Sequence, residues 1–306
     1  MIHIKNTHSS EINAVRKTDF LRYVPVAIFA VMMSLTSCVK DKLFDTPHPD
    51  HGKVAVTADW TARGEGIAVP EKWTANIGDY TGEETTATHA PDDLFAPGEY
   101  RIIAYNSVKD IAVSGTTASV ASAGGRGGFI SGTPGVLFTH VQDITIEKDK
   151  EHAFTAAMCQ QTGSLTLMIE PTGDAAGRIE RIEGSLSGVA GTMDFATGTY
   201  GAPSEVALHF TKITEGEHAG KWTATVWLLG VTGGVQQLSA TIAYTDGNPR
   251  PTALESDLTS ALEGFNGGKT EALTLGGSVV ETPTEGGFSA TITDWEIAEK
   301  DNVVIN

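Results

Sequence analysis

The sequence predicts an all-β protein made of sandwich domains. Apolar and polar residues alternate with a period of two in seven segments, at residues 54–60, 100–104, 144–146, 165–169, 206–210, 222–228 and 238–244. Glycine (34 residues), proline, asparagine and aspartate fill the gaps. Strands with one buried face show this alternation, and turns collect those residue types. Because strands do not alternate with helices, the pattern disfavours a parallel α/β sheet and favours sheets packed face to face.

The first predicted strand shows the pattern most clearly. Val54, Val56, Ala58 and Trp60 share one face and should be buried. The later segments repeat this pattern, and residues 150–158 form a strand that is followed by a polar turn at residues 160–163. We therefore place a domain boundary near residue 160. This gives an N-terminal domain of residues 53–160 and a C-terminal domain of residues 161–306.

One short helix is predicted in the second domain. Thr252 and Glu255 have the capping-box spacing, in which each side chain accepts a hydrogen bond from an unpaired backbone N–H. Leu254, Leu258 and Leu262 then recur every four residues, and Gly264 provides a C-terminal stop. We expect this helix to cover a sheet edge or one end of a sandwich.

Residues 115–135 are expected to form a long flexible loop, because they contain the run Gly124-Gly125-Arg126-Gly127-Gly128. A phosphate-binding loop would need Lys-Ser/Thr after its glycines and a strand-to-helix setting. Neither is present, so we do not expect nucleotide binding.

The first 37 residues have the features of a secretory signal peptide. Four basic residues precede an apolar run at residues 24–35, which is shorter than the about 20 residues of a membrane span. Leu35-Thr36-Ser37-Cys38 resembles the lipobox of bacterial lipoproteins, in which cleavage falls before the cysteine and its thiol is lipidated. We expect Cys38 to carry several acyl chains, which anchor stably, and residues 38–52 to form a tether. The alternative is an ordinary signal peptide beside an incidental cysteine.

The composition excludes some partners. Removing residues 1–37 takes four basic and two acidic residues from totals of 21 and 38, so the remaining 269 residues carry a net charge of −19. This acidity argues against nucleic acid and anionic lipid as partners. Cys159 is then the only free thiol, and no intramolecular disulfide can form. Its apolar surroundings predict a buried residue rather than a nucleophile.

No catalytic motif is present. The chain lacks HExxH, GxSxG and an EF-hand loop, and its carboxylates are scattered over predicted strands and turns. We therefore expect no enzymatic activity and no cofactor. His48 and His51, with Asp50 between them, are the only clustered candidate metal ligands. With Pro47 and Pro49 beside them, we favour a rigid turn over a metal site.

Five tryptophans are candidates for a sugar-stacking surface: Trp60, Trp73, Trp222, Trp227 and Trp295. Trp60 and Trp222 share the apolar faces of their strands and are expected in the core. Trp227 lies on the opposite face from Trp222, so it either is exposed or packs between domains. A glycan-binding platform therefore stays a minor alternative.

Several segments resemble the fimbrial anchor lipoproteins of Bacteroidales. The resemblance rests on the lipobox cysteine with the following residues 39–54, on Asp59-Trp60, and on Pro97-Gly98-Glu99-Tyr100-Arg101 with Tyr105-Asn106. It also rests on Asp257-Leu258-Thr259, Phe265-Asn266-Gly267-Gly268-Lys269 and residues 287–295. It spans nearly all of the chain after residue 37.

The resemblance implies two transthyretin-like, Greek-key β-sandwich domains, no catalysis, and assembly with fimbrial subunits by strand exchange. It also implies a surface location on the outer membrane, through the lipid on Cys38. Stalk subunits of this kind carry a basic protease site after the first strand, whereas this chain has only the isolated Arg63 there. Cleavage at Arg63 would separate the tether from the body, which favours an anchor or accessory subunit over a stalk subunit.

The resemblance leaves several roles open. A base anchor, an accessory subunit and an adhesive tip subunit can all be lipoproteins, and a surface protein that binds glycan or host ligands is a further alternative. For a base anchor we expect the tail at residues 301–306 to pack on its own domain. The N-terminal domain should then present the groove or edge that accepts a neighbour's strand.

Overall fold

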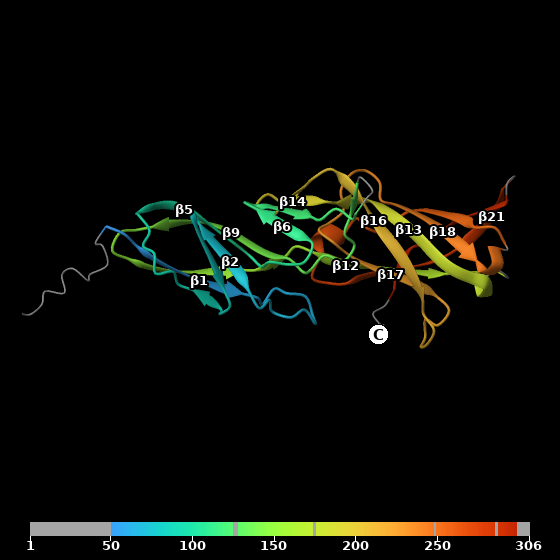
Figure 1. Cartoon of the computed structure of the whole chain (residues 1–306), viewed down its shortest axis with the longest axis horizontal. Helices are drawn as coiled ribbons and strands as arrows, with labels where there is room; N and C mark the ends of the chain where they lie inside the picture. The colour runs from blue at the N-terminus through green and yellow to red at the C-terminus, as the bar shows by residue number, and fades with distance from the viewer. Residues whose placement is uncertain (1–49, 125–127, 174–175, 248, 285–286, 299–306) are drawn as a thin grey trace, which may run out of the picture. The chain divides into compact units, whose positions relative to one another are not determined.

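A computed structural model of the chain describes residues 50–124, 128–173, 176–247, 249–284 and 287–298, and it confirms the all-β sandwich fold (Figure 1). Within these ranges the helices are 3₁₀ turns of three residues, namely η2 (Ala176–Arg178), η3 (Thr245–Gly247) and η4 (Phe265–Gly267). No helix of the described ranges is long and apolar enough to cross a membrane.

Two sheets contain most of the strands of the first half of the chain. The three-stranded sheet has the order β10-β1-β4, with β1 (Lys53–Asp59), β4 (Thr88–His89) and β10 (Glu151–Ala157). The five-stranded sheet has the order β11-β9-β5-β2-β3, with β2 (Trp73–Ile77), β3 (Tyr80–Glu84), β5 (Gly98–Tyr105), β9 (Phe138–Ile146) and β11 (Cys159–Gln160).

Side chains from both sheets form a first hydrophobic cluster. As the alternation predicts, Val54, Val56 and Ala58 of β1 are buried in it. Ile102 and Ala104 of β5 belong to the same cluster. One face of each sheet is thus removed from water, which is the main stabilising contribution in a sandwich of this kind.

The larger sheet system follows the order β21-β22-β19-β18-β13-β16-β17-β12-β20-β23, and β8 pairs with β16. Its strands are β8 (Phe129–Ile130), β12 (Gly163–Glu170), β13 (Ile179–Ala190), β16 (Pro203–Lys212), β17 (Trp222–Leu228), β18 (Gln237–Tyr244), β19 (Thr252–Asp257), β20 (Leu273–Ser278), β21 (Val280–Thr284), β22 (Gly287–Thr291) and β23 (Glu296–Ile297). A four-stranded sheet has the order β15-β14-β7-β6, with β6 (Ile111–Ser114), β7 (Thr117–Val120), β14 (Thr192–Asp194) and β15 (Thr199–Tyr200).

A second hydrophobic cluster lies among these strands. Leu165, Leu167 and Ile169 of β12 are fully buried in it, as their alternation predicts. Ala118 and Val120 of β7 also belong to this cluster, although they precede β9 and β10 of the first sheets in sequence. The boundary near residue 160 stays a prediction.

The helix predicted at residues 252–262 is wrong. Residues 252–257 form strand β19, in which Thr252, Leu254 and Ser256 are buried and alternate with exposed residues. Glu255 does not cap a helix, because its Oε2 accepts a hydrogen bond from Ser239 Oγ on β18 at 2.7 Å. Leu258 and Leu262 are buried in the following turns, where the Leu262 N–H donates to the Leu258 carbonyl at 3.0 Å. The predicted helical spacing thus combined Leu254 of a strand with two leucines of the turn that follows it.

Two further expectations are wrong. Residues 115–135 are not one long loop, because β7 and β8 lie within them and the Ala123 N–H donates to the Phe129 carbonyl at 2.9 Å. Cys159 is exposed rather than buried. Met158 is fully buried in the first cluster, and the period of two therefore turns the next side chain toward solvent.

Candidate assembly site around the first strand

Strand β1 is the centre of the candidate site, and β10 pairs with it along its full length. The pairing is parallel, from Lys53 opposite Glu151 to Asp59 opposite Ala157. At one end the Lys53 N–H donates to the Lys150 carbonyl at 2.9 Å, and at the other the Met158 N–H donates to the Asp59 carbonyl at 2.9 Å. The first strand is thus integral to its sheet.

The opposite edge of β1 is covered by shorter segments. Gly52 and Phe95 exchange two backbone hydrogen bonds of 2.8 and 2.9 Å, and the Ala58 N–H donates to the Ala87 carbonyl at 2.8 Å. Between these points β4 pairs antiparallel with β1 through only two residues, Thr88 and His89. A strand this short needs other contacts to hold it in place.

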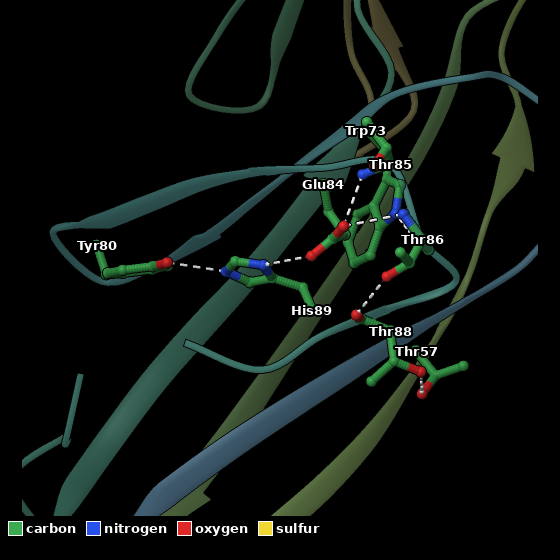
Figure 2. Close-up of polar contacts among 8 residues, drawn as sticks. All are labelled: Thr57, Trp73, Tyr80, Glu84, Thr85, Thr86, Thr88 and His89. Atoms are coloured by element: carbon green, nitrogen blue, oxygen red, sulfur yellow. Dashed lines mark hydrogen bonds and ion pairs between the residues drawn. The ribbon is translucent and has the colours of Figure 1, made fainter. Parts of the chain in front are cut away.

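A polar network supplies those contacts (Figure 2). His89 is buried, and its Nε2 lies 2.9 Å from Tyr80 Oη while its Nδ1 lies 3.4 Å from Glu84 Oε2. Because a carboxylate only accepts, the Nδ1 of His89 is the donor to Glu84. The ring also stacks on Tyr80 and meets Trp73 edge to face. These contacts fix β4 to both ends of β3.

Glu84 organises the turn between β3 and β4. Its Oε1 accepts the N–H groups of Thr85 at 2.7 Å and Thr86 at 2.9 Å, as Figure 2 shows. These two hydrogen bonds lower the pKa of the Glu84 carboxyl from 4.5 to about 2, so it is charged at neutral pH. The carboxylate thus joins the turn backbone to His89.

Two further contacts tie this turn to the sandwich. Trp73 Nε1 donates to the Thr86 carbonyl at 2.8 Å, and the hydroxyls of Thr57 and Thr88 lie 2.9 Å apart (Figure 2). Residue 82 of β3 has to be glycine, because a Cβ there would overlap His89 Nε2 and Tyr80 Oη. The edge of β1 opposite β10 is therefore closed by a defined set of side chains.

The outer edge of β10 is open. In the described part of the chain β1 is the only strand that pairs with β10. Glu151, Ala153, Thr155 and Ala157 are exposed, whereas His152 and Phe154 are half-buried and Ala156 is buried. An edge strand with unpaired N–H and C=O groups is a template for another strand. The site thus combines a locked first strand with an unpaired neighbour.

Toward the other end of the chain, the segment after β22 is hydrogen-bonded to strand β19 of the same chain. Trp295 Nε1 donates to Ser256 Oγ of β19 at 2.8 Å, and Ser256 Oγ in turn donates to the Ile292 carbonyl. Ile292 is buried in the second cluster, and Trp295 packs against it. The expected internal packing of residues 301–306 lies outside the described residues.

The predicted site residues have different outcomes. Cys38 and His48 lie outside the described residues, so lipidation stays a prediction. Asp50 is exposed, and the described ranges contain no group of three or more His, Cys, Asp or Glu side chains that could hold a metal. Arg63 lies in a turn, where its Nη1 and Nε donate to the carbonyls of Trp60 and Ile67, both at 3.0 Å.

The tryptophans do not form an exposed platform. Trp73 and Trp222 are buried, with 2% and 5% of their surface exposed. Trp60, Trp227 and Trp295 are half-buried. Trp60 packs against the first cluster, with its ring edge to face on Phe138 at 5.4 Å. Its expected place in the core is therefore only partly met, whereas that of Trp222 is confirmed.

Comparisons with known proteins support the fold. No model of a protein family and no curated protein matches the sequence. Among solved structures, a candidate adhesin from Bacteroides ovatus is 10% identical with a TM-score of 0.55, over 86% of this chain and 95% of that one. The fimbrial anchor protein Mfa2 from Porphyromonas gingivalis is 13% identical with a TM-score of 0.53, over 81% and 97%.

A third structure, of candidate polysaccharide-binding proteins from Bacteroides thetaiotaomicron, is 10% identical with a TM-score of 0.53, over 81% of this chain and 98% of that one. Each likeness extends over nearly the whole of the other protein. The chain therefore shares the fold of a fimbrial anchor protein from Porphyromonas gingivalis and of candidate adhesins from Bacteroides.

Proposed function

We propose that the chain is a non-enzymatic, lipid-anchored subunit of a cell-surface fimbria, acting as the base anchor or an accessory subunit. Neighbouring subunits would join it by β-strand exchange, and lipid on Cys38 would hold it at the outer membrane. The observation that carries the proposal is the pairing of β1 on both edges, because β1 follows the tether at residues 38–52 directly.

The physical reason is mechanical. A lipid on Cys38 retains the body of the protein only while the chain between them stays intact and β1 stays in its sheet. The seven paired residues with β10 and the network around His89 supply that resistance. The fold shared with a fimbrial anchor protein fits this role, although a shared fold alone does not assign it.

The loop after β1 supports retention of the tether. A protease binds its substrate in an extended form, whereas Arg63 is folded back onto the carbonyls of Trp60 and Ile67. The Gly64 N–H also donates to Gln160 Oε1 at 3.0 Å, and a Cβ at Gly64 would overlap the Thr270 carbonyl. Cleavage at Arg63 would require this turn to open.

The clasp formed by Trp295, Ser256 and Ile292 supports an accepting rather than a donating role. A segment that is donated to a neighbour has to leave its own body, and here the segment up to Ala298 is bonded to β19 and β20. Deleting residues 301–306 tests this part. Fibres should stay attached; detachment from a folded, membrane-bound variant would instead make the tail a donor.

The alternative is a surface protein that binds glycan or host ligands, or an adhesive tip subunit. The fold shared with candidate adhesins and candidate polysaccharide-binding proteins favours it. The tryptophans argue against it, because two of the five are buried and the other three are half-buried rather than exposed. Fimbrillin-like reading frames beside the gene would favour the fibre, and transporter and glycosidase genes would favour glycan capture.

Affinity purification of the tagged chain from detergent-solubilised membranes of its own cells tests the proposal. We expect fimbrial subunits to co-purify with the chain. Recovery of the chain without them, together with binding on a glycan array, would establish the alternative instead.

A further inference from the structure

We infer that the outer edge of β10 accepts an extended strand from a neighbouring subunit, while β1 stays in place. The inference rests on the proposed fimbrial function and specifies where the partner binds. In a protein whose first strand is bound to the tether, a partner gains main-chain pairing more readily at a free edge than by displacing β1.

The hydrogen-bond pattern identifies which residues of β10 are free. In a parallel pair, alternate residues of a strand point both their N–H and C=O groups toward the same neighbour. The bonds of Lys150 and Met158 to β1 place His152, Phe154 and Ala156 in the β1-facing set. The N–H and C=O groups of Glu151, Ala153, Thr155 and Ala157 therefore point away from β1.

One of these outward-pointing carbonyl groups already accepts a hydrogen bond within the chain. His140 Nδ1 on β9 donates to the Ala157 carbonyl at 3.1 Å, which closes that end of the edge. At the other end, Lys53 Nζ lies 3.2 Å from the Glu151 carboxylate on the exposed surface. Ala153 and Thr155 lie between these ends, and their exposed side chains are small.

The outermost strands of the other sheets that the structure describes are short or carry charge, proline or a bridging residue. The edge strands β4, β11, β15 and β23 have two residues each, and β3 ends in Glu83 and Glu84. Strand β21 contains Pro283, and the outer side of β6 is bridged by Val108 opposite Ile111. Short strands, charges and proline are the usual means of preventing edge pairing. The seven-residue β10 has none of these within residues 152–157.

The chemistry of the edge defines its partner. Phe154 and His152 are half-buried, and their rings stack with centroids 6.0 Å apart on the inward side of β10. A strand added at the edge would place alternate side chains beside them, so apolar residues at those positions would cover Phe154. A second copy is disfavoured by the net charge of −19 that each chain carries after residue 37. Given the proposed function, the occupant is an extended segment of a different fimbrial subunit.

The variant Thr155→Pro tests the inference. The Thr155 N–H points away from β1, so proline there removes only an outward donor and fits an edge strand. We expect this variant to melt within a few degrees of wild type and to stay membrane-bound. Its yield of co-purified fimbrial subunits should fall at least tenfold. Thr155→Ser, which keeps the N–H, should retain them.

Two further variants separate edge pairing from loss of fold. Thr155→Lys places a charge on the open edge, and Thr199→Lys places the same charge on β15, the exposed edge of another sheet. Of these two lysine variants, Thr155→Lys should release the fimbrial subunits and Thr199→Lys should retain them. If Thr155→Pro proves unstable, this pair of variants alone tests whether the β10 edge binds the partner. Folded Thr155→Pro and Thr155→Lys variants that both retain the subunits would overturn the inference.

The outcomes distinguish this inference from the proposed function. If wild-type protein recovers no fimbrial subunit, the fimbrial function itself is wrong. If wild type recovers them and both Thr155 variants do too, the function stands and β10 is not the acceptor. A purified wild-type dimer that Thr155→Pro dissociates would make a second copy the occupant, and this also contradicts the inference.

Discussion

His89 Nδ1 on β4 lies 3.4 Å from Glu84 Oε2 at the end of β3, and this contact joins the short strand that covers β1 to the turn before it. The other Glu84 oxygen holds the amides of Thr85 and Thr86. A single carboxylate therefore shapes the turn and positions the histidine. If β1 anchors a fibre, Glu84 supports it indirectly, because it holds β4 in place against the edge of β1 that faces away from β10.

Stability should fall in acid through Glu84. Hydrogen bonds from Thr86 and Thr85 lower its folded-state pKa from 4.5 to about 2. The stabilisation is present above about pH 4.5 and is lost as the pH falls toward 2, because the unfolded state binds the proton first. Glu84→Gln should lower the melting temperature at pH 7 by on the order of a few degrees and flatten its decline between pH 4.5 and 2.

Circular dichroism melts at several pH values measure this effect. Glu83→Gln is the matched control, since Glu83 is exposed and lies 3.5 Å from Lys72 Nζ on the surface. Equal melting temperatures for the two variants at pH 7 would show that Glu84 does not support the turn.

Stability should rise in mild alkali through Lys269. This side chain is only 7% exposed, with its Nζ 5.1 Å from the centre of the Tyr200 ring and 3.7 Å from Met193 Sδ. Burial lowers the pKa of Lys269 to about 8. Because an unfolded lysine stays charged up to about pH 10.4, the unfolded state binds more protons between these values, and stability increases with pH there.

Lys269→Met should remove this increase and be at least as stable as wild type at pH 7, because a buried charge is replaced by an apolar chain of similar length. Urea unfolding at pH 7, 8, 9 and 10 measures the difference. Lys72→Met, on the exposed surface, should keep the increase. An increase that persists unchanged in Lys269→Met would assign it to another group.

The C-terminal clasp depends on Gly277. A Cβ there would overlap Ile292 Cγ2 and approach the Trp295 ring at 3.2 Å. Gly277→Ala should destabilise the protein by about 1–3 kcal/mol and expose the segment after Ile292 to limited proteolysis. Gly264→Ala is the control, because a Cβ at Gly264 meets open space. Identical proteolysis of both variants and wild type would contradict the clasp.

Local sequence patterns predicted which side chains point inward, but not which strands pair. The alternation in Val54, Val56 and Ala58 identified the buried face of β1, because that information lies in adjacent residues. The partner of β1 is β10, almost one hundred residues later. No local pattern encodes this pairing, so the open edge of β10 could not be derived from the sequence.

The errors have related causes. Leu254, Leu258 and Leu262 have helical spacing, yet pairing of β19 with β18 and β22 determines the conformation of residues 252–257. Tyr80, Glu84 and His89 carry no recognisable motif, because their contacts depend on the turn that leads from β3 in one sheet to β4 in the other. Tertiary pairing outweighed local propensity in both places.

The distribution of subunit and fibres between membranes and culture medium, compared for wild type and Cys38→Ala in the native cells, tests the central claim most directly. The account predicts that Cys38→Ala releases the folded subunit into the medium together with the fibres attached to it. Membrane retention of the variant and its fibres at the wild-type level would contradict it.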